Sequence, residues 1–146
     1  MGRGLSFRLV SGTFSTVLKV EERIAYMKLC DLNKYIEIDI AEALEERFME
    51  SEELYVRFLK KLEAANDLAV VEGFVAEENW PEAMRKAHNL KGVCASLGLT
   101  RLTAQLAELV KLLRSDGFTK EQVSEQLEGI KPEWDKTLGY IRELEA

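Results

Sequence analysis

The chain has 146 residues, and its 26 acidic side chains outnumber its 20 basic ones, which gives a formal net charge of −6. This length favours one domain, which can bury enough surface to fold without a disulfide framework or a structural metal. Nucleic acid and anionic membranes need a basic face, so the acidic balance argues against both as partners. No apolar run approaches the roughly 18 residues of a membrane span, and we expect a soluble, cytoplasmic, monomeric protein.

Reactive side chains are scarce, and this scarcity excludes several kinds of active site. The single histidine is His88, so a zinc site that needs two histidines is ruled out. A Ser-His-Asp or Cys-His catalytic system would have to use this same residue. The two cysteines, Cys30 and Cys94, are too few for a disulfide scaffold. We expect the protein itself to hold no metal and no cofactor.

Residues 1–35 differ in pattern from the rest of the chain and form a leader of unknown structure. A Ser-Gly turn dipeptide between two runs that favour β structure is compatible with a hairpin over residues 7–20. A second hypothesis is that the native start is Met27, because a purine-rich run resembling a ribosome-binding site can encode Glu21-Glu22-Arg23. The intact mass of the native protein tests this hypothesis.

Apolar residues recur at helical spacing almost throughout residues 36–146, which predicts one all-α domain. Side chains that cap helices, or residues that open them, stand at Asp39, Ser51, Asp67, Asn79, Thr100 and Thr119. The apolar positions of the resulting helices are Leu44 and Phe48; Leu54, Phe58 and Leu62; Leu68, Val71 and Val75; Leu102, Leu106, Leu109 and Leu113; and Trp134, Leu138 and Ile141. We expect the last helix to break near Gly129 to Pro132, and we assign Met49, Met84 and Phe74 to the core as well.

Amphipathic helices joined by short polar turns predict an antiparallel four-helix bundle core with short additional helices. The helix that starts at Asn79 should run to Leu97 and stop at Gly98, which suits a left-handed position. Its core stripe is predicted to be Ala83, Ala87, Leu90, Cys94 and Leu97. His88 lies beside this stripe, at its edge.

The helical neighbours of His88 suit a phosphoryl group. A neutral imidazole nitrogen is a competent nucleophile toward phosphorus, and Lys91, one turn away, can neutralise part of the added charge. Gly92 and Ala95 leave the helix surface flat, so a partner could bring a carboxylate close. A mid-helix glycine costs about 1 kcal/mol relative to alanine, which suggests that something approaches closely. No Gly-rich phosphate loop is present, so we expect a phosphocarrier and not an ATP-using enzyme.

The run His88-Asn89-Leu90-Lys91-Gly92, followed by Ala95-Ser96-Leu97-Gly98, resembles the core motif of histidine-containing phosphotransfer (HPt) domains. The segments Ile38 to Leu44, Glu52 to Tyr55 and Asn79 to Ala83 also resemble parts of such domains. The resemblance covers about residues 36–115. It implies a four-helix bundle and a role in two-component phosphorelays, with phosphohistidine exchanged with an aspartate on a response-regulator receiver domain.

Carried over to this chain, the resemblance makes His88 the phospho-accepting residue, Lys91 the charge partner of the phosphate, and Gly92 the clearance residue. Arg85 and Ala95 belong to the expected binding surface. Some members place a glutamine or a basic residue on the next helix, facing the histidine, and Arg114 is the residue that could serve here. The implied partners are a receiver domain, whose own Mg²⁺ would assist the transfer, and a sensor or hybrid histidine kinase.

Each of these residues also has a structural interpretation. His88 would then be a histidine at the edge of a helical core, Gly92 a site of close helix packing, and the cations Lys91, Arg85 and Arg114 ordinary solvated charges. The matching alternative function is a non-catalytic helical interaction module in which the histidine is never phosphorylated. An enzyme that uses Cys94 or the histidine is a third class, which the predicted core position of the cysteine disfavours.

Overall fold

The computed structural model describes residues 28–144, and every regular element in this part of the chain is helical. Contacts divide it into two compact units, one formed by Leu32–Arg142 and the other containing residues 28–31 and 143–144 of those described. The elements are η1 (Leu29–Lys34, a 3₁₀ helix), α2 (Ile40–Arg47), α3 (Glu52–Ala65), α4 (Asp67–Ala76), α5 (Trp80–Ser96), α6 (Thr100–Arg114) and α7 (Lys120–Arg142).

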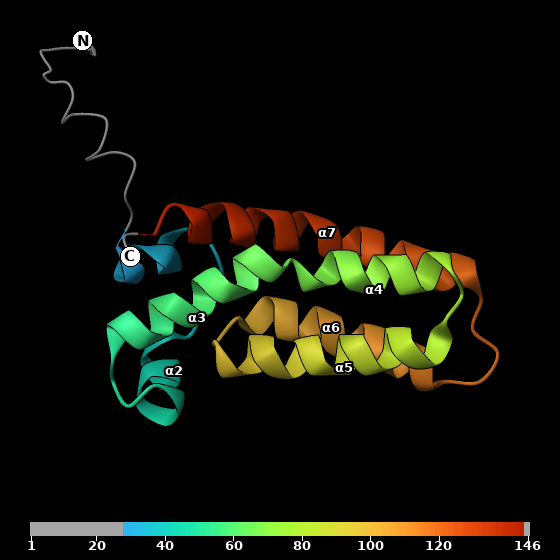
Figure 1. Ribbon diagram of the computed structural model, residues 1–146, viewed down its shortest axis with the longest axis horizontal. Coiled ribbons are helices and arrows are strands. Elements are labelled where there is room, and N and C mark those ends of the chain that lie inside the picture. The colour runs from blue at the N-terminus through green and yellow to red at the C-terminus, as the bar shows by residue number, and fades with distance from the viewer. Residues whose placement is uncertain (1–27, 145–146) are drawn as a thin grey trace, which may run out of the picture. The chain divides into compact units, whose positions relative to one another are not determined.

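Helices α3 to α7 enclose an apolar core (Figure 1). Helix α5 packs against α4 and α6, while α7 packs against α3, α4 and α6. The stripes predicted for α4, α6 and α7 are confirmed, since all of their members are buried: Leu68, Val71, Val75, Leu102, Leu106, Leu109, Leu113, Trp134, Leu138 and Ile141. Long-range burial of these stripes stabilises helices whose isolated propensity would be marginal.

Three predicted helix starts are confirmed by hydrogen bonds. The side chains of Asp39 and Ser51 each accept a hydrogen bond from the backbone N–H three residues on, over 3.1 Å. Ahead of α7, the Thr119 N–H donates to Gln122 Oε1 over 2.8 Å, and the Gln122 N–H donates to Thr119 Oγ1 over 3.1 Å. This last pair is a complete capping box, which satisfies two backbone donors that the helix itself cannot.

The cap predicted at Asp67 is wrong, because Asp67 is already the first residue of α4. The preceding residue, Asn66, has a φ of 47° and ends α3 while it opens α4. Its side chain does not cap α4 but accepts a hydrogen bond from the indole N–H of the buried Trp134 over 2.9 Å. A buried indole N–H needs a hydrogen-bond acceptor. The Asn66 side chain, which its position would favour as a helix cap, accepts this bond from α7 instead.

The break predicted near Gly129 to Pro132 is also wrong, because α7 runs unbroken through it. Proline lacks an N–H and crowds the carbonyl four residues before it, which disfavours a helix on local grounds. Here Ile130 and Trp134, on either side of the proline, are both buried in the core. Pro132 itself is exposed, so we attribute the continuity of α7 to the burial of its flanking residues.

The C-terminal end of α5 is joined to α2 and α3 by backbone and side-chain contacts. Gly98 has a φ of +75°, the left-handed conformation predicted for it. Its carbonyl accepts a hydrogen bond from the Asp39 N–H over 2.8 Å, and the buried Tyr55 hydroxyl donates to the Leu97 carbonyl. Burial, with a smaller contribution from the Asp39 charge, raises the pKa of Tyr55 above its ordinary value, so the hydroxyl stays protonated as a donor.

Some residues assigned to the core from the sequence lie at the surface. Met49 is 86% exposed and Phe58 is 42% exposed, whereas Phe48 and Trp134 are buried as expected. Phe48 follows α2 as its C-cap and stacks on Tyr55, with their ring centroids 4.8 Å apart. The two exposed residues lie on α3 or in the turn before it. Leu44, Phe74 and Met84, also predicted in the core, are half-buried.

Two predictions for the leader, the hairpin over residues 7–20 and the start at Met27, fall outside the described residues. Within residues 28–144, no helix combines the length and the hydropathy that crossing a membrane requires.

Candidate functional site

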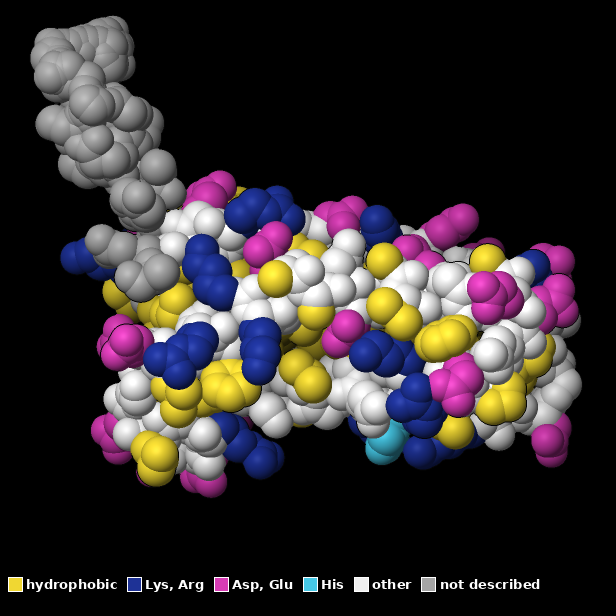
Figure 2. Space-filling view, viewed as in Figure 1, with side chains coloured by type: hydrophobic (Ala, Val, Ile, Leu, Met, Phe, Trp, Pro, Cys, Tyr) yellow, Lys and Arg dark blue, Asp and Glu magenta, His cyan; other side chains and the backbone are white. Residues whose placement is uncertain are grey.

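The histidine of α5 is open to solvent. The core stripe predicted beside it is confirmed, because Ala83, Ala87, Leu90, Cys94 and Leu97 are all buried. His88 itself is exposed, and neither of its ring nitrogens forms a hydrogen bond with another described residue. Figure 2 shows its side chain at the surface, close to lysine and arginine side chains. A visiting group can therefore reach a lone pair of the imidazole.

The surface above the histidine is flat, with one unpaired cation, Lys91, beside it. Side chains three or four residues apart on a helix are neighbours, with Cβ atoms about 5–6 Å apart, so Lys91 and Gly92 both flank His88. Lys91 is half-buried and pairs with no described carboxylate. A Cβ built on Gly92 meets no atom within 4 Å, and Ala95 is exposed one turn further on. Contrary to the packing alternative, no described helix packs against Gly92.

Of the two predicted arginines, Arg85 lies one helical turn before His88 and is paired with a carboxylate, whereas Arg114 lies farther away on α6. The Arg85 Nε donates to Glu82 Oε1 over 3.0 Å, and this hydrogen bond lowers the pKa of Glu82. Arg114 is exposed at the end of α6. Because α5 and α6 are joined by a short turn around Gly98, the helical rise places Arg114 about 9 Å beyond His88 along the pair. The described geometry therefore assembles His88, Lys91, Gly92 and Ala95 on one surface.

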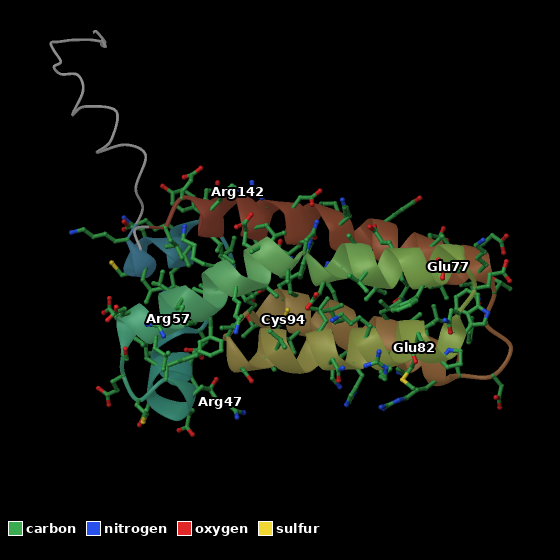
Figure 3. The ribbon with its side chains drawn as sticks, viewed as in Figure 1. Arg47, Arg57, Glu77, Glu82, Cys94 and Arg142 are labelled. Carbon is green, nitrogen blue, oxygen red and sulfur yellow. The ribbon has the colours of Figure 1, made fainter. Side chains whose placement is uncertain are left out.

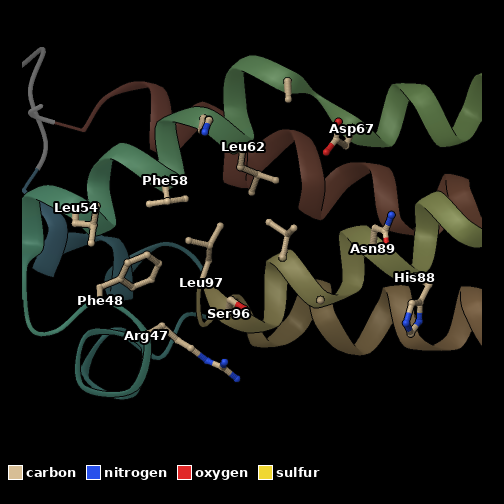
Figure 4. Close-up of a pocket in the computed structure, with 14 residues that line it drawn as sticks. Arg47, Phe48, Leu54, Phe58, Leu62, Asp67, His88, Asn89, Ser96 and Leu97 are labelled. Atoms are coloured by element: carbon tan, nitrogen blue, oxygen red, sulfur yellow. The ribbon is translucent and has the colours of Figure 1, made fainter.

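A groove of about 1030 Å³ opens beside the histidine, between α5 on one side and α2 and α3 on the other. His88 and Gly92 stand on its α5 wall, and Arg47 and Lys61 stand on the opposite wall. Its apolar lining includes Phe48, Leu54, Phe58, Leu62, Val93 and Leu97. Figure 4 shows Phe48, Leu62 and Leu97 between the ribbons of α3 and α5, with Leu54 and Phe58 on α3. The imidazole of His88 therefore lies at the edge of a surface that could hold an apolar partner segment.

This groove was not expected, because the sequence predicts Leu54, Phe58 and Leu62 in the core. Leu62 is buried as predicted, together with Tyr55, Val56 and Leu59, whereas Phe58 is exposed and Leu54 is half-buried. The signal was present in the sequence, since the apolar residues of α3 span about 200° at 100° per residue, twice the arc of an ordinary core stripe. One half of that arc is buried, and the other half, with Leu54 and Phe58, lines the groove.

The core stripe predicts a buried, inert thiol at Cys94. Its side chain is buried on the inward face of α5 (Figure 3), and burial raises the pKa of its thiol to about 12. Since the thiolate is the nucleophilic form, an enzyme mechanism that uses Cys94 has no support in the structure.

The two thiols are expected to differ in reactivity with a disulfide reagent at pH 8. Cys30 is exposed and should react quickly, whereas Cys94 should react more than about a hundredfold more slowly until the chain is unfolded. Absorbance of the released thiol gives both rates. Cys30→Ser should remove the fast phase and Cys94→Ala should leave it. Two fast thiols in the native protein would contradict the burial of Cys94.

Comparison with known families agrees with this geometry. The family model described as the Hpt domain matches residues 53–143. The chain belongs to the Hpt domain family. Hpt domains are phosphocarrier modules of phosphorelays that interact with histidine kinases and response regulators, and in general they are not enzymes.

The match to the Hpt domain includes the whole histidine helix and extends through α7 to residue 143. It is therefore longer at its C-terminal end than the resemblance over residues 36–115, and it does not include the segment Ile38 to Leu44. No curated protein and no solved structure matches the chain.

Proposed function

We propose that this Hpt domain is a phosphorelay intermediate that accepts a phosphoryl group on His88 and exchanges it with an aspartate of a receiver domain. The observation that carries the proposal is the exposed imidazole of His88, which forms no hydrogen bond with a described residue and has open space above Gly92 beside it. A histidine that served the packing of the core would be buried, with its ring nitrogens hydrogen-bonded.

The transfer needs no nucleotide and little chemistry from this chain beyond the nucleophile. The lone pair of one ring nitrogen forms the P–N bond while the P–O bond to the receiver aspartate breaks, and the carboxylate leaves with the electron pair. The proton stays on the other ring nitrogen. Such transfers depend mainly on positioning and electrostatics, and we expect the Mg²⁺ that assists the step to belong to the receiver. The reverse transfer uses the same atoms.

The surface around His88 suits this step. Gly92 and Ala95 present no side chain that would block an incoming carboxylate, and the groove beside them offers an apolar surface for the partner. Lys91 is close enough to meet the phosphoryl oxygens. Arg85 and Arg114 remain proposed contacts at the margin of this surface, the first already paired with Glu82.

Several finer predictions belong to the same proposal. We propose an antiparallel four-helix core in which α3 and α4, consecutive along the chain, together form one member and α5, α6 and α7 form the other three. In support, α5 packs against α4 and α6, and α7 packs against α3, α4 and α6. Residues 36–146 would be the phosphotransfer domain and 1–35 a separate leader. A monomeric state, a cytoplasmic location and the absence of a cofactor stay predictions.

The proposal is tested by mixing the protein with several receiver domains that carry labelled aspartyl phosphate. The expected product is a labelled protein whose phosphate is lost in acid and stable in alkali, as a phosphohistidine is. If no receiver in the set transfers its label, the alternative of a non-catalytic helical interaction module is favoured. Phosphoramidate, a small donor that needs no docking surface, reports separately whether the imidazole can be phosphorylated.

Changing Lys91 to alanine is expected to slow transfer from a phosphorylated receiver by about tenfold, because a charge-assisted contact to the phosphoryl oxygens is lost. The fold should be unaffected, since Lys91 is not part of the buried core stripe of α5 and pairs with no described residue. Rapid-quench measurement of labelled protein gives the rate, and circular dichroism gives the helix content. A Lys91→Ala protein that unfolds, or one that transfers at the wild-type rate, would contradict this role.

A further inference from the structure

The groove beside His88 carries two cations that have no partner in the described part of the chain. Arg47 ends α2 and Lys61 lies on the outer side of α3, and both side chains line the groove. Neither forms an ion pair with a described residue. Figure 4 shows the Arg47 side chain extending away from its ribbon. Acidic residues outnumber basic ones in this chain, so two unpaired cations on one wall are a local excess of positive charge.

Several cations elsewhere on the described part of the chain are matched by its own carboxylates, although Lys91, Lys111 and Arg114 are not. Examples are Arg85 with Glu82 and Lys131 with Asp135. The acidic residue that lines the groove, Asp67, is itself paired with Lys86, with 3.4 Å between Nζ and Oδ1. The carboxylate of Asp67 is therefore paired with a lysine that does not line the groove. It does not neutralise the charges of Arg47 and Lys61 on the opposite wall. The groove combines an apolar lining with positive charge that no described group balances.

The contacts of Lys61 keep its charge at the groove. Its Nζ lies 5.5 Å from the centroid of the Phe58 ring, an arrangement in which the ring face attracts the ammonium group. Phe58 is itself 42% exposed and lines the groove. A partner segment that covers this ring would therefore meet the ammonium group at its edge.

We propose that Arg47 and Lys61 select the receiver partner by pairing with carboxylates that flank an apolar segment docked in the groove. This inference rests on the proposed phosphorelay function. The expected occupant is an amphipathic helix of the receiver, because a groove between helices with an apolar lining accepts the apolar face of such a helix. Charge at the margin of an interface raises the association rate and discriminates among partners more than it adds affinity.

The position of the two cations separates docking from chemistry. Along α5 the groove extends from His88 to Leu97, which is about 14 Å of helix. Arg47 and Lys61 come from α2 and α3, on the wall opposite His88, and neither takes part in forming the P–N bond at the ring. Arg47 and Lys61 should therefore change how fast a receiver associates and leave the rate within the bound complex unchanged.

The test uses the full chain and the receiver that transfers fastest to it. Arg47→Glu and Lys61→Glu are each expected to lower the second-order rate of transfer about fivefold to tenfold at low salt, with a smaller loss at high salt. The rate at saturating receiver should stay the same. Lys131→Glu is the control, because it makes the same charge change on a half-buried residue of α7 that pairs with Asp135 and does not line the groove.

The outcomes separate this inference from the function on which it rests. Phosphorylation by phosphoramidate should be equal in all four proteins, which shows that the imidazole and the fold are intact. Suppose that the receiver phosphorylates the wild-type protein, and that it phosphorylates Arg47→Glu and Lys61→Glu with the same second-order rate constant. Partner selection by these cations is then overturned. It is also overturned if Lys131→Glu slows transfer equally, since overall charge would then be responsible. If no receiver transfers to the wild type, the relay function itself fails, and the selection with it.

Discussion

Replacing His88 with glutamine is expected to abolish phosphoryl transfer from any phosphorylated receiver. A carboxamide is not a nucleophile toward phosphorus, so the loss should be about a thousandfold or more, down to the background of the assay. Glutamine retains similar length and polarity, and the imidazole it replaces is exposed and makes no hydrogen bond to a described residue. The free energy of unfolding should therefore change by less than about 0.5 kcal/mol.

A control variant and a binding measurement distinguish loss of the nucleophile from loss of docking. Asn89→Ala changes the exposed neighbour of His88 on the same helix and should leave a labelled protein. Receiver binding, measured by titration with an unphosphorylated receiver, should persist in His88→Gln because the groove is intact. Retention of an acid-labile label in His88→Gln would place the phosphate on another residue and overturn the assignment. Loss of both label and receiver binding would indicate a role in docking, not in carrying phosphorus.

Replacing Gly98 with alanine is expected to destabilise the domain by about 2–4 kcal/mol, the largest stability effect predicted from a single methyl group here. The residue has a φ of +75°, where an L side chain is strained. A Cβ at this position would also lie 2.5 Å from the backbone oxygen of Asp39, which cannot move aside as a flexible side chain would. Urea unfolding followed by circular dichroism measures the loss.

Gly92→Ala is the matched control for this prediction. The same methyl group meets no atom within 4 Å there, and alanine is favoured over glycine in a helix interior by up to about 1 kcal/mol. Gly92→Ala should therefore raise the midpoint of urea unfolding while Gly98→Ala lowers it. Equal midpoints for the two variants would show that the contact between the end of α5 and Asp39 is not as close as described.

Local pattern was most informative where a residue's surroundings come from its own helix. The caps at Asp39, Ser51 and Thr119 and the left-handed turn at Gly98 follow from backbone groups within a few residues. The core stripe beside His88 follows from helical periodicity alone, because the residues it needs are all on α5. The exposed position of the histidine followed from its place beside that stripe.

Local pattern failed where contacts from distant parts of the chain compete with it. Asn66 serves Trp134, which is 68 positions away, and not the helix that follows it. The helix through Pro132 continues because its neighbours are buried against other helices. On α3 the apolar arc is wide enough both to pack into the core and to line the groove. Helical periodicity alone could not decide which half of the arc would be buried.

The sequence by itself determined that this chain is helical and that His88 stands exposed beside Lys91 and Gly92, because those relations lie within one helix. The tertiary structure alone decided that Arg47, Phe58 and Lys61 lie across a groove from that histidine. Their positions depend on how α2 and α3 join the end of α5 through Asp39, Tyr55, Leu97 and Gly98. Contacts between residues more than forty positions apart leave no periodic trace in the sequence.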